Sequence, residues 1–130
     1  MGYPQEGLTI RRIITQSIKR AERWHKGDIG VWSPLEWAGA MCGEAGEAAN
    51  AAKKLKRLTD EIQNINAGDR QISSIRIAKQ TVAKEVADTL LYAVLLMAAV
   101  DISPEQAEEI ICEVFNKKSE EYGFPERLGF

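Results

Sequence analysis

Apolar residues recur at helical spacing along most of the chain, and they mark out a series of predicted helices. Near the N-terminal end, Ile10, Ile13, Ile14 and Ile18 lie three or four positions apart, which places them on one face of a helix. The same spacing predicts helices over residues 9–26, 34–58, 74–100 and 104–122. No useful length alternates with the period of two that is typical of strands. We therefore expect an all-α fold, a bundle of four to five helices.

Two short segments carry the signal that opens a helix. Residues 33–36 (Ser-Pro-Leu-Glu) and 103–106 (Ser-Pro-Glu-Gln) each place a serine before a proline, with Glu or Gln three residues after the serine. Such a capping box satisfies backbone N–H groups that the first turn of a helix leaves unpaired. Residues 59–73 are predicted to be a polar connection, because Asn64 and Asn66 lie among other turn-forming residues.

Length and composition narrow the class of protein. The chain has 130 residues, the size of one domain, and its 45% hydrophobic content excludes a disordered chain. The formal net charge of −2 gives no broad positive field, which disfavours nucleic acid and anionic membranes as partners. Residues 1–9 lack the features of a secretory signal. We expect a single domain over residues 1–130, located in the cytoplasm, with no nucleic-acid or membrane partner.

The cysteines indicate no disulfide framework and no zinc ribbon. Cys42 and Cys112 are the two cysteines of the chain, they lie far apart, and neither belongs to a Cys-x-x-Cys motif. Both fall within apolar helical patterns. We therefore expect both to be buried as small hydrophobic side chains.

The longest apolar run, residues 90–100, predicts an oligomer. It is too short for the ~20 residues of a membrane span, and a helix that is apolar all round is normally buried on every side. In so short a chain the expected cover is a second copy, in a homodimer or homotetramer. Gly43 and Gly46 interrupt an alanine-rich helix and cost up to ~1 kcal/mol each relative to alanine. This indicates that another backbone or a ligand approaches them closely.

Two pairs of acids stand three residues apart inside apolar stretches: Glu44 with Glu47, and Glu85 with Asp88. Residues at this spacing share one face of a helix. A buried carboxylate is costly unless it is paired or bound to a metal ion. If the two helices pack antiparallel, the four carboxylates converge, and oxygen ligands of this kind suit Mg²⁺ or Mn²⁺.

Residues 43–48 (Gly-Glu-Ala-Gly-Glu-Ala) and 84–92 (Lys-Glu-Val-Ala-Asp-Thr-Leu-Leu-Tyr) resemble the all-α nucleoside triphosphate pyrophosphohydrolases. This MazG-like superfamily also contains the dCTP pyrophosphatases, and its pattern is Glu-x-x-Glu, a spacer and Glu-x-x-Asp on adjacent helices. Residues 116–125 resemble the family's terminal helix, and the resemblance covers about residues 32–130. Many members of the family carry a further glutamate at the position of Gly43, whereas members that resemble the dCTP pyrophosphatases have glycine there, as this chain does.

The resemblance implies a hydrolase that cleaves a nucleoside triphosphate between the α and β phosphates and releases a monophosphate and pyrophosphate. Such an enzyme needs Mg²⁺, with Mn²⁺ as the alternative, because four carboxylates and a triphosphate repel one another. The expected role is house-cleaning of the nucleotide pool. The implied metal ligands are Glu44, Glu47, Glu85 and Asp88. Glu47 and Glu44 are the catalytic candidates, and Glu47 is the first choice for orienting the attacking water as a base.

Basic and aromatic side chains near the acids are candidate contacts for the triphosphate, sugar and base. Lys54 follows Glu47 by seven residues, which is about 10 Å along a helix axis and on the same side. Tyr92 follows Asp88 by four residues, so the two are neighbours on the helix surface. The candidate substrate-binding residues are Lys54, Lys53, Tyr92, Asn116, Lys117, Trp32 and Trp37.

Two other functions stay open. One is a non-catalytic helical module of the same fold that acts in interaction or regulation. The other is a hydrolase of a different pyrophosphate-containing nucleotide. Both acidic pairs are intact, which favours an enzyme, since a decayed site would be expected to have lost at least one acid.

Overall fold

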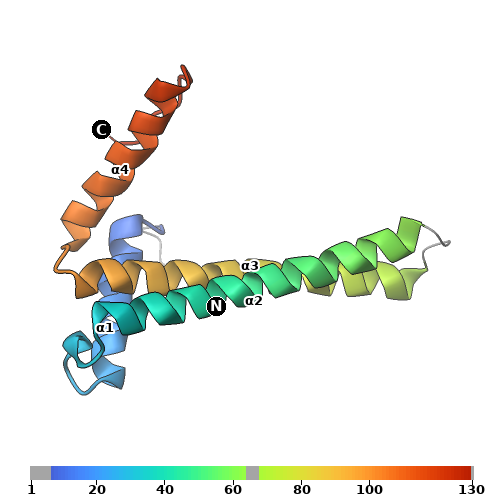
Figure 1. The fold of residues 1–130 in the computed structure, drawn as a ribbon, viewed down its shortest axis with the longest axis horizontal. Coiled ribbons are helices and arrows are strands. Elements are labelled where there is room, and N and C mark those ends of the chain that lie inside the picture. Colours follow the sequence, from blue (N-terminus) through green and yellow to red (C-terminus); the bar gives the residue numbers. More distant parts are fainter. Residues whose placement is uncertain (1–6, 64–67, 130) are drawn as a thin grey trace. The chain divides into compact units, whose positions relative to one another are not determined.

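The chain is all-α, as expected. The computed structural model describes residues 7–63 and 68–129, and within them it contains helices and no strand. The helices are α1 (Ile10–Trp24), the short 3-10 helix η1 (Ile29–Val31), α2 (Pro34–Gln63), α3 (Asp69–Ala99) and α4 (Pro104–Glu121) (Figure 1). In the described residues no helix on its own has the length and apolarity of a membrane span. One bent pair, α3 with α4, meets that test only when the two are taken together.

The two Ser-Pro segments mark helix starts correctly, because α2 begins at Pro34 and α4 at Pro104. The capping box at the second start is confirmed in both directions. The Gln106 backbone N–H donates to Ser103 Oγ over 3.1 Å, and the Ser103 backbone N–H donates to Gln106 Oε1 over 2.9 Å.

The predicted polar connection over residues 59–73 is wrong for most of its length, because α2 continues to Gln63 and α3 begins at Asp69. Polar residues here support the helix instead of ending it. Thr59 Oγ1 donates to the Leu55 carbonyl over 2.9 Å, and Lys56 Nζ pairs with Asp60 Oδ2 at 2.7 Å. The ion pair, one turn apart, stabilises the exposed side of this segment, and Leu55, Leu58 and Ile62 lie at helical spacing and are partly buried. Asn64 and Asn66 lie outside the described residues.

The start of α3 has a cap that the sequence analysis missed. The Gly68 backbone N–H donates to Gln71 Oε1 over 3.1 Å, which is the reciprocal half of a capping box. Asp69 adds a negative charge in the first turn, where the helix dipole favours it. The glutamine three residues after Gly68 was the available sequence signal.

Contacts divide the chain into two compact units. Unit 1 consists of Met1–Pro34 and Val94–Phe130, and unit 2 is Leu35–Ala93. The last turns of α3 therefore belong to unit 1 and the rest of that helix to unit 2. The single domain stays a prediction.

Unit 1 holds the hydrophobic core. Its centre is Ile14, Val94 and Ala107, and Ile14 is only 1% exposed. The partly buried side chains packed around this centre are Ile10, Ile13, Ile18, Met97 and Ile102. The isoleucine face predicted for the first helix is thus the face that is buried. Arg11 on α1 also pairs with Glu108 on α4, with 3.2 Å between Nη2 and Oε1.

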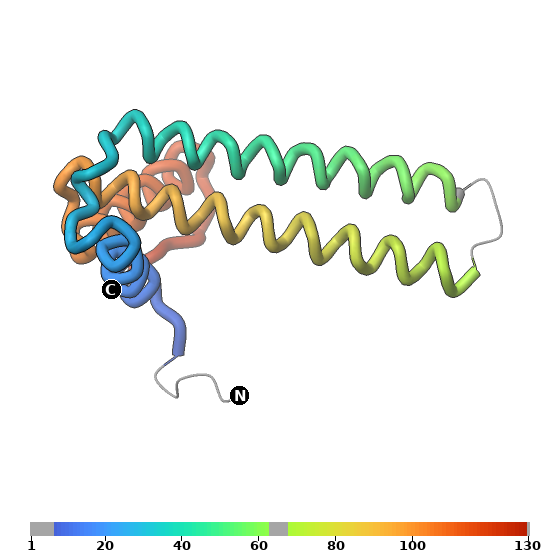
Figure 2. Tube along the Cα trace, turned by 90° about the horizontal axis from the view of Figure 1, so that it is seen from below, coloured from blue at the N-terminus to red at the C-terminus, as the bar shows by residue number. Residues whose placement is uncertain are grey.

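Unit 2 is built from α2 and most of α3, which run side by side in opposite directions (Figures 1 and 2). Its buried apolar residues are Trp37 and Ala78, whereas Ile77 is 63% exposed. The Trp37 ring lies 6.2 Å from the Tyr92 ring, measured between centroids. Few side chains of unit 2 are therefore sealed from solvent within this single chain.

The prediction for the cysteines is wrong for Cys42, which is exposed on α2, and Cys112 on α4 is only partly buried. Small glycine and alanine neighbours surround Cys42 along α2 and cannot cover it. Nor does a backbone of the described residues approach the glycines, since a Cβ built on Gly43 or Gly46 meets nothing within 4 Å. Close packing inside the chain does not explain these glycines.

Candidate metal centre

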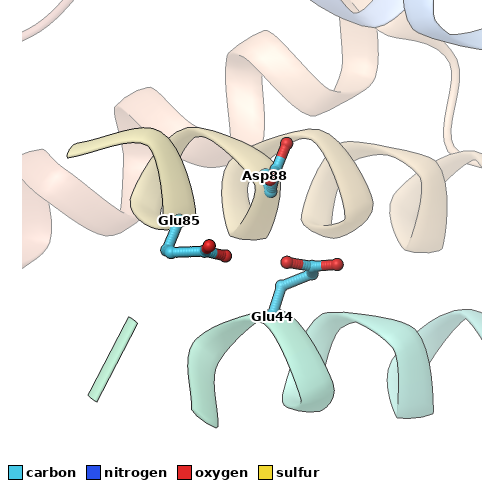
Figure 3. A group of neighbouring side chains, drawn as sticks. All are labelled: Glu44, Glu85 and Asp88. Atoms are coloured by element: carbon cyan, nitrogen blue, oxygen red, sulfur yellow. The ribbon is translucent and has the colours of Figure 1, made fainter. Parts of the chain in front are cut away.

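Three carboxylates from α2 and α3 converge in unit 2. Glu44 lies on α2, and Glu85 and Asp88 lie one turn apart on α3 (Figure 3). One oxygen of each lies within 4.8 Å of the others. The antiparallel course of the two helices produces this meeting, because it brings the faces that carry the two acidic pairs opposite each other. We call Glu44, Glu85 and Asp88 the carboxylate trio.

The trio is partly withdrawn from solvent. Glu44 and Glu85 are half-buried, whereas Asp88 is exposed. The Oε2 atoms of Glu44 and Glu85 are inaccessible and have no hydrogen-bond partner in the described part of the chain. A buried polar atom without a partner carries an uncompensated desolvation penalty, so the site favours a ligand that supplies the missing contacts.

The electrostatics of the trio disfavour its anionic form. Burial raises the pKa of Glu44, and the nearby carboxylates of Glu47 and Asp88 raise it further. Burial likewise raises the pKa of Glu85, with Glu47 and Glu44 as the other contributors. A cation placed between these groups would oppose both causes, since it adds opposite charge and a partner for the buried oxygens.

Glu47 stands beside the trio and outside it. Its side chain is exposed, and its negative charge acts on both Glu44 and Glu85. The structure therefore groups three of the four predicted metal ligands and leaves Glu47 outside that group, although close enough to raise the pKa of two of its members.

The trio oxygens are close enough to gather around a divalent cation. In an octahedral Mg²⁺ site, with Mg–O distances of about 2.1 Å, neighbouring ligand oxygens lie about 3.0 Å apart and opposite ones about 4.2 Å. The trio oxygens all lie within 4.8 Å of one another, so the side chains need to move closer together to coordinate an ion. Waters usually fill the remaining positions around Mg²⁺, so three carboxylates are sufficient.

Lys54 lines a cavity of about 270 Å³ between α2 and α3, and Lys53 is exposed on α2. Leu58, Ser74 and Thr81 also line this cavity. The sequence analysis puts Ser74 at the very start of a helix and assigns it no role, so it misses the side chains that α3 contributes to this cavity. The spacing of seven residues between Ser74 and Thr81 was the signal that could have revealed this shared face.

The predicted aromatic contacts divide into two groups. Trp37 is 2% exposed, so its ring is an interior packing surface, and Tyr92 is half-buried against it. Trp32 belongs to unit 1, where its ring lies 5.2 Å from the ring of His25. We therefore leave Trp37 out of the set of residues proposed to contact a ligand.

Asn116 and Lys117 also belong to unit 1, on α4. Lys117 is exposed. The side-chain amide of Asn116 is engaged by the backbone of Leu128, which the sequence analysis did not anticipate.

Comparison with protein-family models, with curated proteins and with solved structures finds no match to this chain. The resemblance to the pyrophosphohydrolases therefore rests on the two acidic motifs and the terminal segment, and it stays a prediction.

Proposed function

We propose that this protein is a Mg²⁺-dependent nucleoside triphosphate pyrophosphohydrolase of the MazG-like type, acting in the cytoplasm on unwanted nucleotides. The observation that carries the proposal is the carboxylate trio, with two buried oxygens that lack partners. A structural role for these acids is a poor explanation, because their mutual repulsion and burial destabilise the helix pair that holds them.

The donor set fits a hard divalent cation, with Mn²⁺ as an alternative to Mg²⁺. Glu44, Glu85 and Asp88 would hold the ion. When bound, it would neutralise phosphate charge and make water a better nucleophile. Without it, the acids would repel a triphosphate.

The remaining steps belong to side chains of the chain itself. Glu47, exposed beside the trio, would accept a proton from the water that attacks the α phosphate. The bond between the bridging oxygen and the α phosphorus breaks, so that pyrophosphate leaves and the monophosphate remains. Lys54 lies seven residues beyond Glu47 on α2 and would balance the charge of the distal phosphates.

We also propose that the working form is a homo-oligomer, a dimer or a tetramer. Unit 2 exposes large apolar side chains, with Leu35 at the start of α2 and Ile77 and Val86 on α3. Exposed apolar surface of this kind is used in protein–protein contacts. The same surface is the observation that favours the second candidate function, a helical interaction module without catalysis.

The deciding experiment incubates the protein with each ribonucleoside and deoxyribonucleoside triphosphate in the presence of Mg²⁺ and measures pyrophosphate. We expect release that EDTA abolishes. The absence of pyrophosphate from every nucleotide, together with a melting temperature that Mg²⁺ does not raise, would contradict the proposal and favour the interaction module. Activity confined to another pyrophosphate-containing nucleotide would indicate a hydrolase of that nucleotide instead of a triphosphate pyrophosphohydrolase.

A further inference from the structure

The segment that follows α4 folds back along that helix. Beyond the C-cap residue Tyr122, the Phe124 backbone N–H donates to the Ser119 carbonyl over 2.8 Å, and this contact reverses the chain. Asn116 and Leu128 are twelve positions apart in the sequence, yet the two are in direct hydrogen-bond contact. We call residues 123–129 the strap.

Asn116 fastens the far end of the strap with two hydrogen bonds. Its Nδ2 donates to the Leu128 carbonyl over 2.8 Å, and its Oδ1 accepts from the Leu128 backbone N–H over 2.7 Å. A side-chain amide carries one donor and one acceptor on the same edge, so it pairs with a peptide group as a neighbouring strand would.

At the near end of the strap, the Gly123 backbone N–H also donates to the Glu120 carbonyl over 3.2 Å, whereas the contacts of Arg127 stay within the strap. The Arg127 guanidinium donates to the carbonyls of Phe124 and Glu126, over 2.7 and 2.8 Å. The apolar side chains anchor the strap only weakly, because Leu128 is 43% and Phe124 57% exposed. Solvent-exposed hydrogen bonds with little apolar burial around them are the kind that open locally.

The strap covers a partly buried thiol. Leu128 and Gly129 line a cavity of about 300 Å³ together with Ile10, Ile111 and Cys112. A Cβ added to Gly129 would lie 3.5 Å from Cys112 Sγ, so the backbone of the strap passes close to the sulfur. Gly129 also has a φ of +99°, which disfavours any side chain at this position.

We propose that residues 123–129 are a releasable strap, fastened by Asn116, that covers Cys112 and the cavity beside it. Asn116 is then a positioning residue. This inference is independent of the carboxylate trio, which lies in the other unit.

The test measures how fast iodoacetamide alkylates Cys112 in the full-length chain. A Cys42→Ser background removes the other, exposed thiol. Asn116→Ala removes both fastening bonds from the helix side. Leu128→Pro removes the N–H that donates to Asn116, and it lies outside every helix, so it keeps the test valid if the first variant fails to fold. Asn50→Ala, at an exposed position of α2, is the matched control.

We expect alkylation to become about tenfold faster in Asn116→Ala, which loses both hydrogen bonds, and about threefold faster in Leu128→Pro, which loses one. The Asn50→Ala control should stay within about twofold of the parent. Amide exchange at Leu128 should accelerate in Asn116→Ala. Equal alkylation rates in all variants would show that the strap does not shield Cys112 and would overturn the proposal. A faster rate in Leu128→Pro alone would overturn the role of Asn116. Acceleration in the control would show a general loosening and would also overturn the proposal.

Discussion

Unit 1 and unit 2 differ in the kinds of side chain that they bury. In unit 1, Ile14 and its neighbours form a buried apolar core. In the capping box of α4, the side chains of Ser103 and Gln106 both accept a hydrogen bond from a backbone N–H. In unit 2, buried apolar residues are few, and two carboxylate oxygens are inaccessible without a hydrogen-bond partner in the described part of the chain. The first arrangement is typical of a part that maintains the fold, and the second of a part that needs a ligand.

The helix α3 carries this difference within one continuous element. Val94 and Leu95 near its end are buried in unit 1, whereas Glu85 and Asp88, two to three turns earlier, belong to the trio. Both stretches have the same apolar background in the sequence. What distinguishes them is the presence of acids on the face that meets α2.

The largest difference between the units should appear in activity. Glu85→Ala removes a trio ligand, and we expect pyrophosphate release to fall about a thousandfold or more, which corresponds to about 4 kcal/mol in the barrier. The control Glu113→Ala removes an exposed acid of α4 in unit 1 and should leave the rate unchanged. A similar loss of pyrophosphate release in Glu85→Ala and Glu113→Ala would show that the acids of the trio have no special role in activity.

The next effect concerns stability. Ile14→Ala opens a cavity in the core of unit 1 and should lower the free energy of unfolding by about 3 kcal/mol, measured in urea. Ile77→Ala, at an exposed site of unit 2, should change it by less than about 0.5 kcal/mol in the monomer. If a second copy covers Ile77, that loss will instead depend on protein concentration, and the comparison will have identified an interface.

A smaller effect should separate the helix caps from exposed helix positions. Ser103→Ala removes the side chain that caps α4 and should cost about 1 kcal/mol of unfolding free energy. Ser73→Ala replaces an exposed serine within α3 and should stay within about 0.5 kcal/mol of the parent. Equal costs would mean that the capping box contributes nothing specific to unit 1.

The smallest effect is a pH dependence of the metal-free protein. The pKa of Glu44 is raised by folding, so the folded protein holds this proton more tightly and loses stability as pH rises through the raised value. Glu44→Gln has no such group. In EDTA, its melting temperature should exceed that of the parent at neutral pH, and the gap should narrow at mildly acidic pH. A gap that widens on acidification would contradict the assigned direction.

Much of the fold could be predicted from local signals. The serine–proline segments locate two helix starts, and the isoleucine spacing locates the buried face of α1. The extension of α2 to Gln63 escapes this prediction, because Thr59 and Asp60 favour turns, although Leu55, Leu58 and Ile62 continue the helical spacing.

The candidate site was predicted in part, for a related reason. The spacing of Glu85 and Asp88 fixes a shared helix face, and one antiparallel neighbour is enough to bring Glu44 to it. Which tryptophan is interior depends on packing, and so does the partner of Asn116. Nothing local in the sequence connects Asn116 with Leu128.

The unpartnered oxygens of Glu44 and Glu85 can take up either a proton or a metal ion. Burial and neighbouring acids raise the pKa of both groups, so a cation that binds the trio would compete with protons for them. The heat of Mg²⁺ binding should therefore change with the ionisation enthalpy of the buffer. The slope of that change counts the protons that the trio exchanges for its ion.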